Sequence, residues 1–213
     1  MIDIPGEYKI IGIMSGTSLD GLDLAYCTFL YKDNRWHYLI GETTTLPYEE
    51  RWKKVLADLP AFKEEKIRSI DREYGSYIGK TAAGFIESHS LEPDLIASHG
   101  HTVFHDPARG ITLQIGNGQD IASITGIKTI NDFRSQDLSL GGQGAPLVPI
   151  GDKLLFQDYD YCLNLGGFAN ISYESAGLRI GYDISPCNLV LNTLSRHLGK
   201  DFDKDGIIAR QGR

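Results

Sequence analysis

Near the N-terminus, a glycine-rich turn joins two apolar segments: Ile10-Ile11-Gly12-Ile13-Met14, then Ser15-Gly16-Thr17-Ser18-Leu19-Asp20-Gly21, then Leu22-Asp23-Leu24-Ala25-Tyr26. Gly16 and Gly21 permit positive φ angles and close approach of the backbone. Successive backbone N–H groups in such a turn can hold the end of a polyphosphate without any Lys or Arg. Asp20 and Asp23 could then hold a hydrated Mg²⁺, which needs few carboxylates. The composition is also typical of an ordinary hairpin turn, so both interpretations remain open.

The turn belongs to a predicted antiparallel meander, with strands at 9–14, 22–31 and 36–46. Two helices are predicted to follow, one at 48–59 before Pro60 and one at 63–88. The second has an apolar face made of Ile67, Ile70, Tyr74, Tyr77, Phe85 and Ile86. Further strands at 94–98, 112–115 and 127–130, with a helix at 119–125, predict an α/β layer on a mixed sheet.

A second, similar set of elements is predicted after the flexible stretch 135–149, which contains Gly141-Gly142-Gln143-Gly144-Ala145-Pro146-Leu147-Val148-Pro149. Strands at 159–165, 169–173 and 178–182 form another meander, followed by a helix at 187–198. We therefore expect a first unit over 1–131 and the start of a second over 132–213. The second unit would expose an apolar face and an unpaired edge, so we expect the chain to be a fragment.

Composition excludes several classes of protein. The net charge of −7 argues against a nucleic-acid or anionic-membrane partner, and 41% hydrophobic residues are enough to build a globular core. No apolar run is long enough to span a bilayer, and the N-terminus lacks the pattern of a signal peptide. The three cysteines are far apart and predict no disulfide framework. We therefore expect a cytoplasmic protein.

A histidine-rich segment, Ser98-His99-Gly100-His101-Thr102-Val103-Phe104-His105, follows the predicted strand at 94–98. Ligands of α/β sheets usually bind at this end of a strand. We expect a polar ligand loop in which Thr102 bonds to a hydroxyl. The alternative is a metallohydrolase site that uses the three histidines.

Arg134 stands between two acids in Asn131-Asp132-Phe133-Arg134-Ser135-Gln136-Asp137. Its planar guanidinium suits bidentate capture of a carboxylate. Alternatively, it pairs with Asp132 or Asp137 near the surface, which would contribute little to stability.

Two motifs in the second half also carry polar groups at strand ends. The first, Asn164-Leu165-Gly166-Gly167-Phe168-Ala169-Asn170, is a small-residue turn placed like the N-terminal one. The second, Tyr182-Asp183-Ile184-Ser185-Pro186-Cys187-Asn188, puts Asp183 ahead of a helix whose first turn suits Pro186. Asp183 could be a general base. From its position alone, however, a helix cap is the preferred interpretation.

Six motifs, in this order along the chain, closely resemble those of the anhydro-N-acetylmuramic acid kinases, a family of the sugar kinase/Hsp70/actin superfamily. They lie at 12–23, 98–105, 132–137, 141–149, 164–170 and 183–188. The resemblance implies an α/β fold of the ribonuclease H-like, two-lobed actin type with a deep cleft, whose second lobe is incomplete here. It also implies ATP-dependent hydrolytic opening and 6-phosphorylation of 1,6-anhydro-N-acetylmuramic acid, giving N-acetylmuramic acid 6-phosphate for peptidoglycan recycling.

The resemblance also assigns roles to individual residues. The ATP phosphates would be bound by Gly16, Thr17, Ser18, Leu19, Asp20, Gly21 and Asp23, and Mg²⁺ by Asp20 and Asp23. Thr102 and Arg134 would hold the sugar, with Arg134 on its lactyl carboxylate. Asp183 would be the base that activates water to attack the anomeric carbon. A homodimer would be compatible with the family.

The chain departs from the family pattern at several positions. After the catalytic Asp the family usually has Thr-Gly-Pro-Gly-Asn, whereas this chain has Ile184-Ser185-Pro186-Cys187-Asn188. Asn192 stands where an Asp is common, and His101 replaces a Gln. Family members are also much longer. These departures leave a second hypothesis open, a truncated and catalytically inactive remnant that binds the sugar alone.

Overall fold

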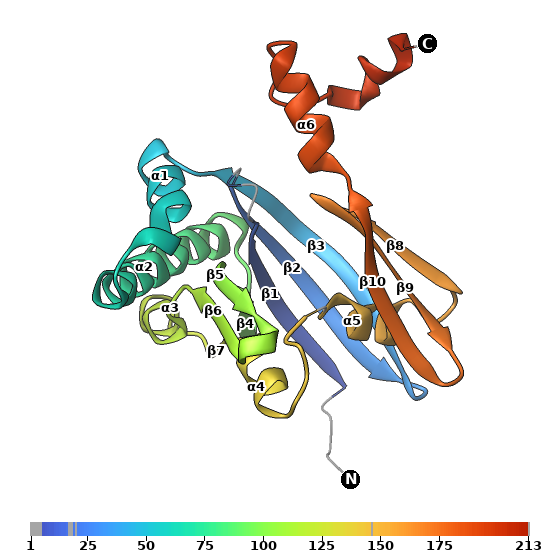
Figure 1. The fold of residues 1–213 in the computed structure, drawn as a ribbon. Helices are drawn as coiled ribbons and strands as arrows, with labels where there is room; N and C mark the ends of the chain where they lie inside the picture. The colour runs from blue at the N-terminus through green and yellow to red at the C-terminus, as the bar shows by residue number, and fades with distance from the viewer. Residues whose placement is uncertain (1–5, 17–18, 20, 146, 213) are drawn as a thin grey trace. The chain divides into compact units, whose positions relative to one another are not determined.

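The computed structural model describes residues 6–16, 19, 21–145 and 147–212. The chain forms two compact units, Met1–Ala145 and Pro146–Arg213 (Figure 1). Their boundary falls inside the glycine- and proline-rich stretch 135–149.

The first unit is built on a five-stranded mixed sheet with the order β3-β2-β1-β4-β7. The predicted meander is confirmed, since β1 (Glu7–Ser15), β2 (Gly21–Lys32) and β3 (Arg35–Pro47) pair antiparallel. On the other side of β1, β4 (Leu95–Ser98) and then β7 (Thr129–Ile130) are added in parallel. The chain is therefore a mixed α/β protein.

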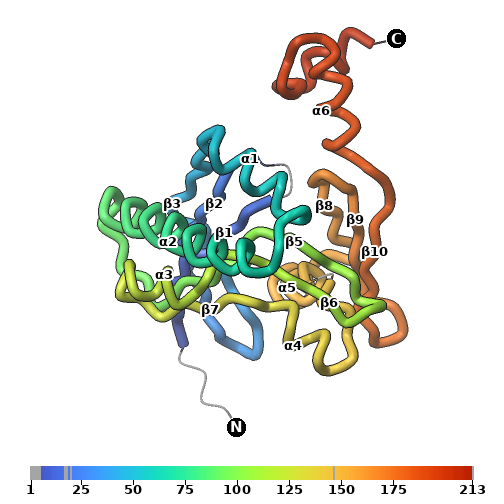
Figure 2. The backbone as a smooth tube through the Cα atoms, turned by 60° about the vertical axis from the view of Figure 1, so that its left-hand side comes forward, coloured from blue at the N-terminus to red at the C-terminus, as the bar shows by residue number. Residues whose placement is uncertain are grey.

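Helices cover one face of this sheet (Figures 1 and 2). They are α1 (Glu50–Asp58), the 3₁₀ turn η1 (Leu59–Ala61), α2 (Glu64–His89) and α3 (Gly118–Thr125). The predicted apolar face of α2 is largely confirmed, because four of its six residues are buried in the core: Ile67, Ile70, Tyr74 and Phe85. Tyr77 and Ile86 are only partly buried. Ile78 and Ala82, which the prediction missed, complete that face.

Alternation along the strands separates the two faces of the sheet. Ile11, Ile13, Leu22 and Leu24 point to the helices and are at most 3% exposed. The residues that alternate with these along β1 and β2 lie on the opposite face of the sheet, which the helices of this unit do not cover. They are Gly12, Met14, Asp23 and Ala25. We call this second surface the open face.

The segment 98–105, expected to be a polar loop, is largely a strand. Residues His101–Asp106 form β5, which pairs antiparallel with β6 (Ile111–Ile115) in a separate two-stranded sheet. The turn η2 (Pro107–Arg109) joins them. His101 and Val103 are buried, whereas Thr102 between them is half-buried. The prediction was wrong because histidine was read as a polar loop residue although here it fills a core position.

Two helices were not predicted, α4 (Phe133–Ser139) and α5 (Val148–Leu155). Both lie where the glycine-rich composition and the small or polar residues suggested loops. Asp132 caps α4, since its side chain accepts a bond from Ser135 N at 3.4 Å. The cap of Asp132 favours α4, and a proline in the first turn favours α5.

The second unit contains a three-stranded antiparallel sheet with the order β10-β9-β8. Its strands are β8 (Tyr161–Leu165), β9 (Phe168–Ser175) and β10 (Leu178–Pro186), followed by α6 (Asn188–His197) and the turns η3 (Lys204–Gly206) and η4 (Ala209–Gln211). The second meander and its helix are thus confirmed. One sheet face is strongly apolar and solvent-exposed, with Tyr161, Leu163, Leu165 and Tyr182 each more than half exposed.

The other face of this sheet holds α5 through a buried polar cluster. Ser172 Oγ donates to Asp152 Oδ2 at 2.5 Å, and Arg179 Nη2 donates to Ser172 Oγ at 2.8 Å. Arg179 and Asp152 also form an ion pair at 3.8 Å, with side chains only 10% and 12% exposed. A buried pair of this kind fixes how elements dock more than it adds stability, whereas removal of one partner leaves an uncompensated charge.

The variant Asp152→Ala should therefore destabilise the second unit by about 3–5 kcal/mol. Breaking the solvent-exposed Lys153–Glu174 pair with Lys153→Ala is the matched control and should cost less than about 1 kcal/mol. Hydrogen exchange of the β9 and β10 amides measures the effect within this unit. Equal protection in both variants would contradict a structural role for the cluster.

Candidate functional site

Three predicted motifs lie at one edge of the first unit's sheet. The strands β1, β4 and β7 run parallel, with Ile13 opposite Ser98 and Ala97 opposite Ile130. The glycine turn, the histidine segment and the Arg134 segment follow the carboxyl ends of these strands in that order. This edge is where open α/β sheets bind their ligands.

The glycine turn is a hairpin connection, since the last pair of β1 and β2 is Ser15 with Leu22. Leu19 adopts a left-handed φ of 57°, and its N–H donates to Gly16 O at 3.4 Å. Thr17, Ser18 and Asp20 lie outside the described residues. Gly21 is required for close packing, because a Cβ there would lie 2.6 Å from Leu46 O. The hairpin interpretation is thus confirmed, and phosphate binding stays a prediction.

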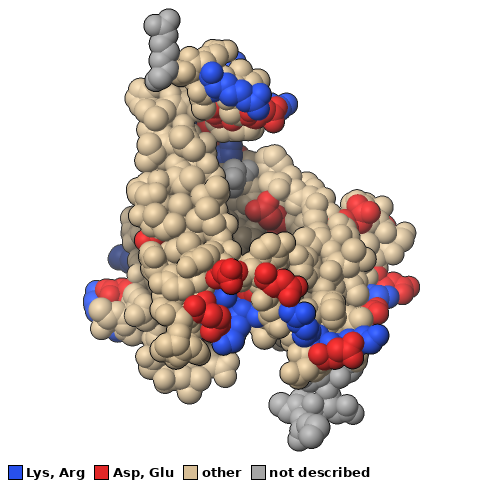
Figure 3. Space-filling view, turned by 90° about the vertical axis from the view of Figure 1, so that its right-hand side faces the viewer, with Lys and Arg blue, Asp and Glu red and all other residues tan. Residues whose placement is uncertain are grey.

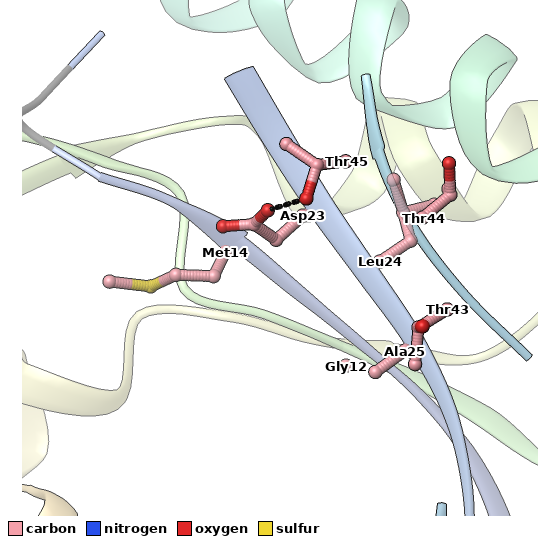
Figure 4. A pocket seen from close by; sticks show the side chains of 8 residues that line it. All are labelled: Gly12, Met14, Asp23, Leu24, Ala25, Thr43, Thr44 and Thr45. Atoms are coloured by element: carbon pink, nitrogen blue, oxygen red, sulfur yellow. Dashed lines mark hydrogen bonds between the residues drawn. The ribbon is translucent and has the colours of Figure 1, made fainter. Parts of the chain in front are cut away.

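Asp23 lies on the open face in a groove of about 520 Å³ (Figure 4). The groove is lined mainly by small and polar residues: Gly12, Met14, Asp23, Leu24, Ala25, Thr43, Thr44 and Thr45. Thr45 Oγ1 donates to Asp23 Oδ1 at 2.5 Å, which leaves the second carboxylate oxygen facing the groove. In the described part of the chain, no three His, Cys, Asp or Glu side chains converge on a metal position. An exposed carboxylate beside hydroxyls suits Mg²⁺, which keeps most of its waters.

A buried chain of polar groups ties the start of the glycine turn to β5. Tyr48 OH donates to Ser15 Oγ at 2.7 Å and lies 2.6 Å from Tyr74 OH. Ser15 Oγ lies 3.0 Å from His101 Nδ1. Burial, and then the neighbouring His99, lower the pKa of His101 to about 4, while burial and then Tyr48 raise the pKa of Tyr74. His101 and Tyr74 are therefore neutral at physiological pH, which lowers the cost of burying them in a polar cluster.

His99 and Arg134 form a second polar cluster. The guanidinium donates to His99 Nε2 through Nε at 3.2 Å and Nη2 at 2.9 Å, and through Nη1 to Gly144 O at 2.6 Å. Burial lowers the pKa of Arg134. Burial and the charge of Arg134 also lower the pKa of His99. The alternative interpretation, in which Arg134 pairs with a neighbouring acid, is wrong, because Asp132 caps α4 and Asp137 binds Gly144 N at 2.7 Å.

The glycine run after α4 packs against Arg134, Asp137 and Leu138. Gly142 N donates to Asp137 O at 2.8 Å, and a Cβ on Gly142 would lie 2.2 Å from Asp137 Oδ2. Gly144 has a φ of +66°, and a Cβ there would lie 2.3 Å from Leu138. The positive φ favours glycine at position 144, and a side chain at either position would displace the side chain of Asp137 or Leu138.

The three histidines do not form one site. His99 bonds to Gly100 and Arg134, His101 to Ser15, and His105 Nδ1 lies 3.2 Å from Thr112 Oγ1. Thr102 is half-buried beside a β-bulge and pairs with Gln114, on the opposite side of β5 from His101. Thr102 thus remains available for a ligand, whereas the histidines serve separate roles.

In the second unit, Asp183 lies within β10 rather than at the start of α6. It is exposed and pairs with Asn170 next to a β-bulge. Helix capping by Asp183 was the wrong interpretation, since Cys187 is the N-cap residue and makes no side-chain cap bond. Pro186 ends the strand rather than entering the helix. The exposed carboxylate therefore has no structural task in the described residues.

Carbonyl groups of the turn 164–170 accept hydrogen bonds from the first N–H groups of α6 and so cap this helix. Cys187 N donates to Gly167 O at 2.8 Å and Asn188 N to Gly166 O at 3.1 Å. Asn188 Nδ2 also donates to Leu165 O at 3.2 Å. The two motifs of the second half, separate in sequence, thus meet in one structure that holds the loop after Asp183.

On the face shown in Figure 3, acidic and basic side chains are interspersed and form no purely positive patch. Among the described residues, no helix has the length and apolar character needed to span a membrane.

Comparison with known proteins gives one consistent result. A family model for anhydro-N-acetylmuramic acid kinase matches residues 8–213. Proteins named anhydro-N-acetylmuramic acid kinase are 37% identical in Pseudomonas paraeruginosa and 38% identical in Gloeobacter violaceus, over 96% and 95% of this chain. A third, from Mannheimia succiniciproducens, is 37% identical over 95% of this chain. The chain spans 58% of the length of the first two relatives and 56% of the third.

The buried His101 predicts a specific dependence of stability on pH. At about pH 5 the folded chain keeps this imidazole neutral, whereas the unfolded chain, with a pKa of 6.5, binds a proton. The contribution of neutral His101 to the free energy of unfolding is complete above pH 6.5 and is lost as the pH falls towards 4. From roughly pH 7.5 to 5, the free energy of unfolding should fall by on the order of 1–2 kcal/mol more in the wild type than in His101→Gln.

Urea denaturation at both pH values measures this difference. His105→Gln, at an exposed position on the same strand, is the control and should behave like the wild type. A wild type and a His101→Gln variant with the same pH dependence would show that His101 is not held neutral.

Proposed function

Because the chain belongs to the anhydro-N-acetylmuramic acid kinase family, we propose that it acts on 1,6-anhydro-N-acetylmuramic acid. The reaction is ATP-dependent hydrolytic opening of the anhydro bridge with 6-phosphorylation, and the product is N-acetylmuramic acid 6-phosphate. One observation carries the proposal. The parallel register of β1, β4 and β7 brings the glycine turn, the histidine segment and Arg134 to one ligand-binding edge.

We assign phosphate binding to the glycine turn and Asp23. The residues concerned are Gly16, Thr17, Ser18, Leu19, Asp20, Gly21 and Asp23. Backbone N–H groups at a turn of this kind favour an anion. Mg²⁺ held through Asp20 and Asp23 would neutralise charge on the phosphates of ATP. The open groove at Asp23, with one carboxylate oxygen free of Thr45, supports this assignment.

We assign sugar binding to Thr102 and Arg134, and the base to Asp183. Asp183 takes a proton from water as the water oxygen bonds to the anomeric carbon. The bond from that carbon to the bridging oxygen breaks, and this oxygen, still attached to C6, receives the γ-phosphoryl group as ADP leaves. A carboxylate without a structural partner in the described residues suits this role, because its lone pairs are not already used.

The same reasoning extends to the architecture. The mixed sheet with three antiparallel and two added parallel strands supports a ribonuclease H-like lobe of the actin type over 1–131. The second meander and helix support the start of a similar lobe over 132–213. The exposed apolar sheet face of the second unit supports an incomplete lobe.

A second candidate is a sugar-binding remnant without turnover. The side chains of Ser185 and Cys187, where the resemblance leads us to expect glycines, favour it, because they flank the end of β10 next to Asp183. The two candidates differ in whether ATP is consumed.

The direct test incubates the chain with Mg-ATP and 1,6-anhydro-N-acetylmuramic acid and measures the mass of the sugar. Kinase activity adds one phosphoryl group and one water. Omission of ATP is the control. Sugar binding in calorimetry without any mass change would favour the remnant, and neither binding nor product would reject both candidates for this chain.

Asp183→Asn should lower turnover by at least about 10²-fold while the dissociation constant of the sugar stays within a few fold. The amide keeps the shape of the side chain but cannot accept the proton of water. Asp160→Asn, at another exposed acid of this unit, is the control. Unchanged turnover in Asp183→Asn would remove this residue from the mechanism.

A further inference from the structure

His99 presents a fixed hydrogen-bond acceptor to Arg134. Its Nδ1 lies 2.9 Å from Gly100 O, and a carbonyl oxygen can only accept, so Nδ1 carries the proton. The lone pair on Nε2 then accepts from the Nε and Nη2 groups of Arg134. Both partners of the imidazole thus select the same tautomer.

Arg134 is anchored on two sides by neutral acceptors. His99 Nε2 holds one edge of the guanidinium, and Gly144 O holds Nη1 at 2.6 Å. Gly144 is fixed in turn by Asp137, whose carboxylate accepts from Gly144 N. Three of the five N–H donors of the guanidinium are therefore engaged, and two remain for a ligand.

The charge of Arg134 is not neutralised inside the described part of the first unit. None of the ion pairs among the described residues includes Arg134, and the two nearest acids in sequence, Asp132 and Asp137, bind backbone N–H groups instead. A half-buried guanidinium held by neutral groups keeps its full attraction for an external anion. A carboxylate acceptor in place of His99 would cancel that attraction.

We propose that His99 is a positioning residue that aims Arg134 at a substrate carboxylate, so that the site selects acidic anhydrosugars over neutral ones. This inference rests on the proposed function, and it assigns to His99 a specificity role that acts through Arg134. Burial and the facing charge of Arg134 lower the pKa of His99, which keeps the imidazole neutral and able to accept. His101, whose pKa burial and then the neighbouring His99 lower to about 4, is neutral as well.

The test compares His99→Gln with His99→Leu. Glutamine can place its carbonyl oxygen where Nε2 stands, whereas leucine fills the space without an acceptor. Calorimetry measures the dissociation constants of 1,6-anhydro-N-acetylmuramic acid and of the neutral 1,6-anhydro-N-acetylglucosamine. His99→Leu should weaken binding of the acidic sugar about tenfold or more and leave the neutral sugar unchanged, and His99→Gln should restore selectivity. His105→Leu, at an exposed histidine, is the control.

A second readout needs no sugar. Nitrogen-15 NMR of the side chains should show the Nδ1–H tautomer of His99 and an Arg134 Nε–H signal that shifts in His99→Leu but not in the control. The opposite tautomer, or equal weakening of both sugars in His99→Leu, would overturn the positioning role while the proposed function stands. A wild type that shows the expected NMR signature but binds neither sugar would contradict the proposed function, and with it the proposed sugar selectivity.

Discussion

The parallel pairing of β4 with β1 is the interaction on which the rest of the first unit depends. It sets Ser98 opposite Ile13, and His99 N continues the ladder with a bond to Ile13 O at 3.0 Å. Through this register the histidine segment emerges beside the glycine turn, and Ser15 comes within bonding distance of His101. A shift by one residue would turn the buried apolar side chains to the opposite face, so the register is strongly specified.

Around this edge, polar side chains are either neutral or hydrogen-bonded to nearby backbone N–H groups. The tyrosine–serine–histidine network is buried and uncharged, and Asp132 and Asp137 are bound to backbone N–H groups. Among the described residues of this edge, Arg134 has no acidic partner, and Asp23 is exposed. The positive group attracts an anionic ligand group, and the negative group attracts a cation.

Most elements could be predicted from the sequence because they follow simple periodicities. The two meanders, the long helix α2 and the short α3 were correctly predicted. Errors arose where one residue type serves two environments. His101 looked like a loop residue but is buried in β5, and Asp183 looked like a helix cap but lies within β10. Local sequence cannot separate such cases, because the neighbours that decide them come from distant segments.

By itself, the sequence determined the α/β class, the two meanders, the long helix α2, the family and the candidate residues, since these depend on periodicity, turn chemistry and motif order. Tertiary structure alone decided that Ser15 meets His101, that His99 rather than an acid holds Arg134, and that Asp137 serves Gly144. Those contacts join residues that are 86, 35 and 7 positions apart in the sequence. The Ser15–His101 and His99–Arg134 contacts depend on the parallel register of β1, β4 and β7. The Asp137–Gly144 bond depends on α4 and on the glycine turn after it. In each case the hydrogen-bonding geometry, which residue type alone does not reveal, decides the partner.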